Sequence, residues 1–218
     1  MWMPQRSLDP EIMDSDDIPD ADRAAFHRDL ALIHRLLGDV RTVQQRIQRT
    51  RHPVRSVIDI GCGDGAALKH LGEAVGAQVT GIDLRPPESD VHGIPILQRD
   101  ATCDELPAAD VAISMLTLHH LTDQQVVSMI RNTGRSCRRL ICLDLVRHPL
   151  PFALFSTFIG PLIHKVAADD GRQSIRRAFK PKELASLVRD AIAGTRARFD
   201  HEVSPYFAKQ IIDIEFEP

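Results

Sequence analysis

A glycine-rich segment in the first third of the chain is the strongest chemical signal in the sequence. Asp59-Ile60-Gly61-Cys62-Gly63-Asp64-Gly65 lies between an apolar run and a helical pattern. Glycines at such a turn let the backbone approach a ligand that a Cβ atom would hold away. The spacing fits the dinucleotide fingerprint G-x-G-x-x-G/A, and Asp83 lies where a ribose-binding acid is expected. Asp59, however, ends a buried run with a carboxylate, which suits a cationic ligand better than a pyrophosphate.

Short apolar runs alternate with helical patterns after His52-Pro53. Strands of four to six residues that alternate with helices indicate βαβ units and a parallel sheet. Helices are expected at 66–75, from Thr122 through Ile130, and at 181–192. Strands are expected at 54–60, 78–83, 94–98, 111–115 and 140–145, with two further extended runs at 195–203 and 207–216.

The segments outside this alternating pattern are expected to cover the site. Residues 1–19 are either an ordered arm or a floppy lead-in, and two helical patterns follow from Asp20. Residues 1–53 are therefore predicted to form a helical arm or lid, and residues 54–218 the ligand-binding domain with a lid insert at about 147–180. Within that insert, Asp169-Asp170-Gly171-Arg172 is typical of a turn.

The segment VIDIGCGDG (57–65) resembles motif I of the class I S-adenosylmethionine-dependent methyltransferases, in which an acid is followed by x-G-x-G-x-G. Further signals follow in that family's order: GID at 81–83, RDA at 99–101, ADVAISMLTLHHL at 109–121, LICLDLV at 140–146 and FKPKELASLV at 179–188. The resemblance covers roughly residues 54–216. It implies a Rossmann-like, doubly wound α/β fold with a mostly parallel seven-stranded sheet and helices on both faces. It also implies a methyltransferase that uses S-adenosylmethionine.

The same resemblance assigns residues to the cofactor. Gly61 and Gly63 would pass against its methionine part, and Asp59 would lie near its ammonium group. Asp83 would accept both ribose hydroxyls, and Asp100 would accept the adenine amine. The implied cofactor-binding set is Asp59, Gly61, Cys62, Gly63, Asp83, Leu84, Asp100, Ala101 and Met115.

Two adjacent histidines follow the fourth expected strand. Ligands bind at the carboxyl ends of the strands in a doubly wound sheet, so His119 and His120 lie where cofactor and acceptor would meet. Removing a proton from a hydroxyl acceptor speeds methyl transfer, and the ordinary histidine pKa suits that role. Asp144, which ends the fifth strand, could orient or replace such a base. The alternative is that the two histidines only border the cofactor or cap the next helix.

Composition excludes several classes of function. The formal net charge is −3, so a basic surface for nucleic acid is not expected. The four cysteines form no Cys/His cluster with metal spacing, which predicts no metal site and reduced thiols in a cytoplasmic protein. The most apolar stretch, 151–163, is too short to span a bilayer.

The N-terminal LDPEIMD and FHRDLALIHRLLG resemble the openings of small bacterial methyltransferases of secondary metabolism, including those that act on phenolic polyketides. This favours O-methylation of a phenolic or polyketide hydroxyl on a small, aromatic acceptor. Three alternatives stay open at this point: C-methylation of a quinone-type ring, an NAD(P)-dependent oxidoreductase, and a non-catalytic module that binds S-adenosylmethionine. The sequence does not indicate the oligomeric state.

Overall fold

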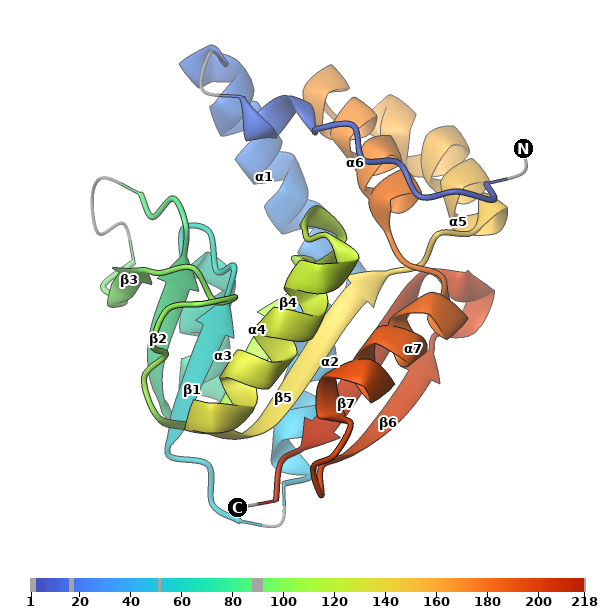
Figure 1. Cartoon of the computed structure of the whole chain (residues 1–218). Helices are drawn as coiled ribbons and strands as arrows, with labels where there is room; N and C mark the ends of the chain where they lie inside the picture. The colour runs from blue at the N-terminus through green and yellow to red at the C-terminus, as the bar shows by residue number, and fades with distance from the viewer. Residues whose placement is uncertain (1–2, 16–17, 51, 88–91, 218) are drawn as a thin grey trace.

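A single seven-stranded sheet forms the centre of the protein (Figure 1). The computed structural model describes residues 3–15, 18–50, 52–87 and 92–217. The strand order is β3-β2-β1-β4-β5-β7-β6; the first five strands are parallel, and β7 pairs antiparallel with both β5 and β6. The strands are β1 (Ser56–Ile60), β2 (Gln78–Asp83), β3 (Ile96–Gln98), β4 (Ala109–Met115), β5 (Cys137–Leu145), β6 (Arg198–Val203) and β7 (Lys209–Glu215).

Helices cover both faces of the sheet, as expected for a doubly wound fold. On one face, α4 and α7 bury Met129 and Leu184 against the strands; on the other, α2 and α3 bury Val43 and Leu68. The α-helices are α1 (Asp20–Leu37), α2 (Asp39–Gln48), α3 (Ala66–Val75), α4 (Asp123–Ser136), α5 (Pro149–Leu154), α6 (Lys165–Arg177) and α7 (Pro181–Ile192). Shorter helical segments are η1 (Ile12–Asp14), η2 (Leu118–His120), η3 (Phe155–Ile159), η4 (Gly160–Leu162) and η5 (Pro205–Phe207).

Local signals explain why several helices begin where the sequence predicts. Thr122 caps α4, since its side chain accepts a hydrogen bond from the Gln125 amide. Pro181 begins α7 at the first helical position, where its missing N–H costs nothing. The expected end of α4 at Ile130 is wrong, because the helix continues to Ser136 and β5 begins directly after it.

The turn predicted at 169–172 is also wrong, because these residues lie inside α6. Asp-Asp-Gly has the composition of a turn, but tertiary contacts outweigh that preference. A Cβ atom on Gly171 would overlap the Phe155 ring, so the glycine serves close packing of two helical segments. Asp170 is buried in the same turn of the helix and binds the N-terminal segment.

The N-terminal segment is an ordered arm that runs along α6 (Figure 1). The Ser7 amide donates to the Arg176 carbonyl oxygen at 3.1 Å. The Ile12 and Met13 amides donate to the two carboxylate oxygens of Asp170, at 2.6 and 2.9 Å. These bonds place η1 at the same end of the sheet as η2, which follows β4. Among the described residues, no helix has both the length and the apolar character needed to span a membrane.

Candidate active site

The glycine loop after β1 packs directly on the turn after β4. The Thr117 hydroxyl donates to the Ile60 carbonyl oxygen at 3.2 Å, and a Cβ atom on Gly61 would overlap the Thr117 side chain. The Gly61 amide donates to the Ile82 carbonyl oxygen of β2 at 2.8 Å. Leu116, between β4 and Thr117, has φ 54°, a strained value that residues without a functional or packing constraint rarely adopt. The loop, β2 and this turn therefore form one connected rim.

Asp59 supplies a buried carboxyl group at the base of that rim. The residue is 2% exposed, and its Oδ1 atom has no hydrogen-bond partner among the described residues. Burial, together with the nearby charge of Asp83, raises the pKa of Asp59 well above its usual range. A cationic ligand would supply the missing partner. The buried, unpaired oxygen therefore fits a cationic group, such as the ammonium group that the resemblance assigns to this position.

Asp83 holds the rim together and keeps acceptor capacity. Its Oδ2 atom accepts from the Gly63 amide at 2.9 Å, and its Oδ1 atom accepts from the Arg85 amide at 2.8 Å. A carboxylate offers about four lone-pair positions, so two further donors such as ribose hydroxyls can be accommodated. A Cβ atom on Gly63 would meet nothing within 4 Å, which leaves room for a ligand over the loop.

The remaining residues assigned to the cofactor lie around the same edge of the sheet. Asp100 accepts from both the amide and the hydroxyl of Thr102, at 2.8 and 2.6 Å, and these hydrogen bonds lower its pKa. Ala101 is buried next to it. Leu84 is exposed directly after β2, and Met115 is the partly buried last residue of β4.

Cys62 is half-buried within the loop itself. Burial is the main cause that raises the pKa of its thiol, so the thiolate is disfavoured. Its sulfur contacts the position where a Cβ atom on Gly81 would lie, so Gly81 has to be a glycine for Cys62 to pack there. Cys62 therefore has a packing role in the structure, and its place in the cofactor-binding set stays a prediction.

His119 and Asp144 form a buried pair across the ends of β4 and β5. The Nδ1 atom of His119 lies 2.7 Å from Asp144 Oδ1, and its backbone amide donates to Asp144 Oδ2 at 3.0 Å. Because a carboxylate only accepts, Nδ1 carries the proton and Nε2 is the nitrogen left for other partners. Burial lowers the pKa of His119, but the charge and hydrogen bond of Asp144, with the charge of Glu11, outweigh it and raise the pKa overall.

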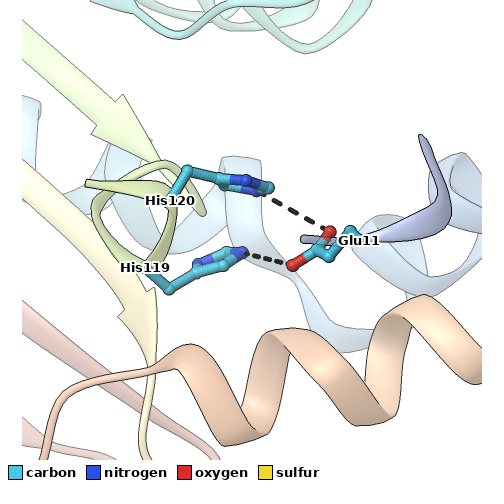
Figure 2. Close-up of side chains that lie close together, drawn as sticks. All are labelled: Glu11, His119 and His120. Carbon is cyan, nitrogen blue, oxygen red and sulfur yellow. Dashed lines mark ion pairs between the residues drawn. The ribbon is translucent and has the colours of Figure 1, made fainter. Parts of the chain in front are cut away.

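Glu11, a residue that the sequence analysis did not identify, completes the cluster from the arm (Figure 2). Its carboxylate oxygens lie 3.7 Å from His119 Nε2 and 3.8 Å from His120 Nε2. The Ser174 hydroxyl of α6 donates to Glu11 Oε1 at 2.8 Å. Burial raises the pKa of Glu11. The sequence carries no periodic or motif signal that links Glu11 to the histidines, since the contact depends on how the arm docks.

Two arginines fix the backbone that carries the histidines. Arg177 donates from Nε to the His119 carbonyl oxygen and from Nη2 to the His120 carbonyl oxygen, both at 3.3 Å. Its Nη1 atom also pairs with Asp14 of the arm at 3.0 Å. Arg6 donates to the same His119 carbonyl at 2.8 Å. The arm, α6 and η2 are thus joined around one point. Burial lowers the pKa of His120 to about 3, so its ring is neutral at pH 7.

The sheet order, with the glycine loop directly after β1, is that of the Rossmann-like fold of class I methyltransferases. Residues 57–139 match the model of the methyltransferase domain family. Over these residues the chain is similar to that family, and its fold is the one found in methyltransferases of known structure.

A relative from Penicillium expansum, the O-methyltransferase cnsE, is 27% identical over 172 residues, which cover 70% of this chain and 62% of the relative. The chain thus spans less than two thirds of the relative's length. The plantazolicin methyltransferase BpumL, solved with S-adenosylhomocysteine, is similar in structure with a TM-score of 0.71, at 13% identity, over 93% of this chain and 92% of that one. Human N-acetylserotonin methyltransferase, solved with S-adenosylmethionine, has a TM-score of 0.62 at 18% identity, over 90% of this chain and 57% of that one.

Proposed function

We propose that the protein transfers a methyl group from S-adenosylmethionine to a hydroxyl oxygen of a small aromatic molecule. The observation that carries this proposal is the His119–Asp144 pair, which lies at the carboxyl ends of β4 and β5 beside the glycine loop. A relative that is named as an O-methyltransferase supports transfer to oxygen. The plantazolicin methyltransferase and the resemblance of the N-terminal segment support an acceptor from secondary metabolism.

The glycine loop and its acids are proposed to hold the cofactor. Asp59 offers its unpaired carboxyl oxygen to a cationic group, and Asp83 offers its remaining lone pairs to hydroxyls. Gly61, Cys62 and Gly63 present the backbone between them. The adenine side of the site is assigned to Leu84, Asp100, Ala101 and Met115. When bound, the cofactor supplies an activated methyl group on a sulfonium, so the chain's main task is to align the acceptor with it.

His119 is proposed as the proton acceptor. Asp144 fixes the ring through Nδ1 and stabilises the positive charge that forms when Nε2 takes a proton from the acceptor hydroxyl. The raised pKa of His119 follows from the same carboxylate and makes the ring a stronger base. His120, whose pKa burial lowers to about 3, is assigned to contact the acceptor without taking its proton.

The division of the chain follows from these roles. Residues 54–218 are proposed to bind the cofactor, while residues 1–53 and the insert at about 147–180 cover the acceptor. The hydrogen bonds of the arm to α6 support this division, because they carry Glu11 to the histidines.

Activity and product structure test the proposal together. The purified chain is incubated with S-adenosylmethionine and a panel of phenols and quinols, and release of S-adenosylhomocysteine is measured. Product NMR distinguishes a methoxy carbon from a ring-bound methyl carbon. A methoxy product is expected. A ring-methylated quinol would show that the protein methylates carbon and not oxygen. Cofactor binding with no release across acceptors of graded size would favour a non-catalytic binding module.

A further inference from the structure

The Glu11, His119 and His120 side chains converge at distances that direct hydrogen bonds do not explain. The two carboxylate-to-imidazole distances, 3.7 and 3.8 Å, exceed the usual range of about 2.7–3.2 Å for such a bond. One ligand atom from each side chain lies within 4.8 Å of the other two. The residues come from the arm and from η2, so the cluster exists only because the arm docks (Figure 2).

We infer that Glu11, His119 and His120 bind a divalent transition-metal ion, with Zn²⁺ as the best-fitting ion. Two imidazole nitrogens and one carboxylate oxygen are the donor set of open zinc sites, in which a fourth position is left for water or substrate. Bonds of about 2.0–2.1 Å in a tetrahedron place ligand atoms roughly 3.3 Å apart. The distance from His119 Nε2 to Glu11 Oε1, 3.7 Å, and that from His120 Nε2 to Glu11 Oε2, 3.8 Å, exceed this value by about half an ångström, and one ligand atom from each of the three residues lies within 4.8 Å of the others.

The outer contacts of the cluster support a metal centre. A ligating histidine usually donates its other ring N–H to a carboxylate, which fixes the ring and strengthens the ligand. His119 does this through Nδ1, with Asp144 at 2.7 Å, so Nε2 faces Glu11. The carboxylate of Glu11 is itself oriented by the Ser174 hydroxyl at 2.8 Å. Both of these ligands are thus held by partners that do not compete for the metal position.

The surrounding charges also favour a cation. Glu11, Asp14 and Asp144 contact the two imidazoles, and Asp170 adds a fourth carboxylate behind Glu11. Against these stand the guanidinium groups of Arg6 and Arg177, which are bound to backbone carbonyls of η2 and to Asp14. The four carboxyl groups thus outnumber the two guanidinium groups around the cluster, and a divalent ion would balance the difference. His120 is 34% exposed in its side chain, so an ion can enter from that side.

A bound ion would change how the acceptor is activated. The ion would occupy Nε2 of His119, so this nitrogen could not take the acceptor's proton. An acceptor hydroxyl in the fourth position would instead release its proton to water, because the ion would stabilise the oxygen anion. Metal binding itself does not depend on methyl transfer, whereas this activating role rests on the proposed function. A metal-dependent enzyme loses activity in a chelator and regains it with Zn²⁺, and an enzyme that uses His119 as a base does not.

Metal binding to the full chain tests the inference without any cofactor. Metal-free protein is titrated with Zn²⁺ by calorimetry, and Co²⁺ is added separately as an absorbing probe. One Zn²⁺ per chain is expected, with a tetrahedral Co²⁺ absorption band that Zn²⁺ removes. Glu11→Gln and His120→Ala should weaken binding by more than the 10–100-fold typical of losing an outer partner, which is the range expected for Asp144→Asn. His70→Ala, on the exposed side of α3, is the matched control and should bind as the unaltered chain does.

Equal Zn²⁺ binding by Glu11→Gln, His120→Ala and His70→Ala would place the ion at other histidines and overturn the inference. So would the absence of saturable binding to the unaltered chain. If Glu11→Gln fails to fold, as judged by far-UV circular dichroism, the Co²⁺ band of the unaltered chain decides, since no tetrahedral band means no ligation by this cluster. Intact Zn²⁺ binding without S-adenosylhomocysteine release would contradict the proposed methyl transfer but would still support the metal site.

Discussion

The His119 imidazole lies between two carboxylates that have different tasks. Asp144 comes from the end of β5 and is part of the rigid sheet, so it fixes the ring whether or not a ligand is present. Glu11 comes from the arm and reaches Nε2, the nitrogen that faces the acceptor in the proposed reaction. In the proposed reaction a group on the arm would therefore lie beside the nitrogen that takes the proton, and changes at residues 3–15 should alter catalysis as well as stability.

Replacing His119 tests its role as proton acceptor. We expect His119→Ala to lower kcat by about 10²–10⁴-fold, the usual contribution of a positioned base, while the dissociation constant for S-adenosylmethionine changes little. Steady-state kinetics and calorimetry on the same protein separate the two effects. His70→Ala is the control on a surface helix. A kcat within a factor of two of the unaltered chain would show that no proton passes through this ring.

Replacing Asp83 tests its proposed role in binding the ribose of the cofactor. We expect Asp83→Ala to weaken binding of S-adenosylhomocysteine by about 1.5–3 kcal/mol, the range for hydrogen bonds to charged groups. The same change removes the acceptors of the Gly63 and Arg85 amides, so the loop also loses its anchor. Calorimetric titration measures the affinity. Asp83→Asn keeps one oxygen acceptor, so its affinity for S-adenosylhomocysteine should lie between those of the unaltered chain and Asp83→Ala. Unchanged affinity in Asp83→Ala would mean that the ribose is held elsewhere.

At the level of elements, α6 is what carries the arm to the site. One face of α6 carries Asp170, Ser174 and Arg177 on successive turns. Asp170 and Ser174 bind the arm, and Arg177 binds η2, the turn that carries His119 and His120 (the histidine turn). His164 caps the start of α6, since its ring accepts a hydrogen bond from the Val166 amide. Its own amide donates to Asp29 of α1. The two segments predicted as lids are therefore one connected unit in the structure.

Removing the Asp170 carboxylate should release the arm. Asp170→Ala leaves the Ile12 and Met13 amides without their acceptors, and partly buried hydrogen bonds to a charged group contribute about 1.5–3 kcal/mol. We expect faster hydrogen exchange at these amides and unchanged exchange in β5. Asp169→Ala is the matched control, because Asp169 forms only a partly exposed pair with Arg172, a kind of contact that contributes little. Equal protection of the arm in both variants would contradict the anchoring role of Asp170.

The sequence predicts the parts of this unit that depend on local rules. The limits of α3 and α7 follow from Gly76 and Pro181, each of which acts through its own backbone. The pairing of His119 with Asp144 follows from two residues at the ends of parallel strands. The docking of Glu11 does not follow, since it requires Asp170 and Ser174 to lie in a helix where their local sequence favours a turn. Contacts between segments that are distant in the chain decide such cases.

In the molecule as a whole, the strand order places the site. Chain connections run outward in opposite directions from β1 and β4, and in sheets of this kind ligands bind at the carboxyl ends of the two strands where the order reverses. The glycine loop follows β1, and the histidine turn follows β4. Cofactor and acceptor are thus both expected at this one point, and a ligand bound there contacts both halves of the sheet.

Ligand binding at the carboxyl ends of β1 and β4 should therefore stabilise the entire fold. A ligand at about 100 times its dissociation constant adds about 2.7 kcal/mol to the free energy of unfolding. For a domain of this size, that raises the melting temperature by roughly 5–11 °C. We expect this shift with S-adenosylhomocysteine and none with NAD, measured by differential scanning calorimetry; Asp83→Ala at the same ligand concentration should show a smaller shift. Stabilisation by NAD alone would instead mean that the glycine loop binds a pyrophosphate, and the unpaired oxygen of Asp59 would then have no cationic partner to explain it.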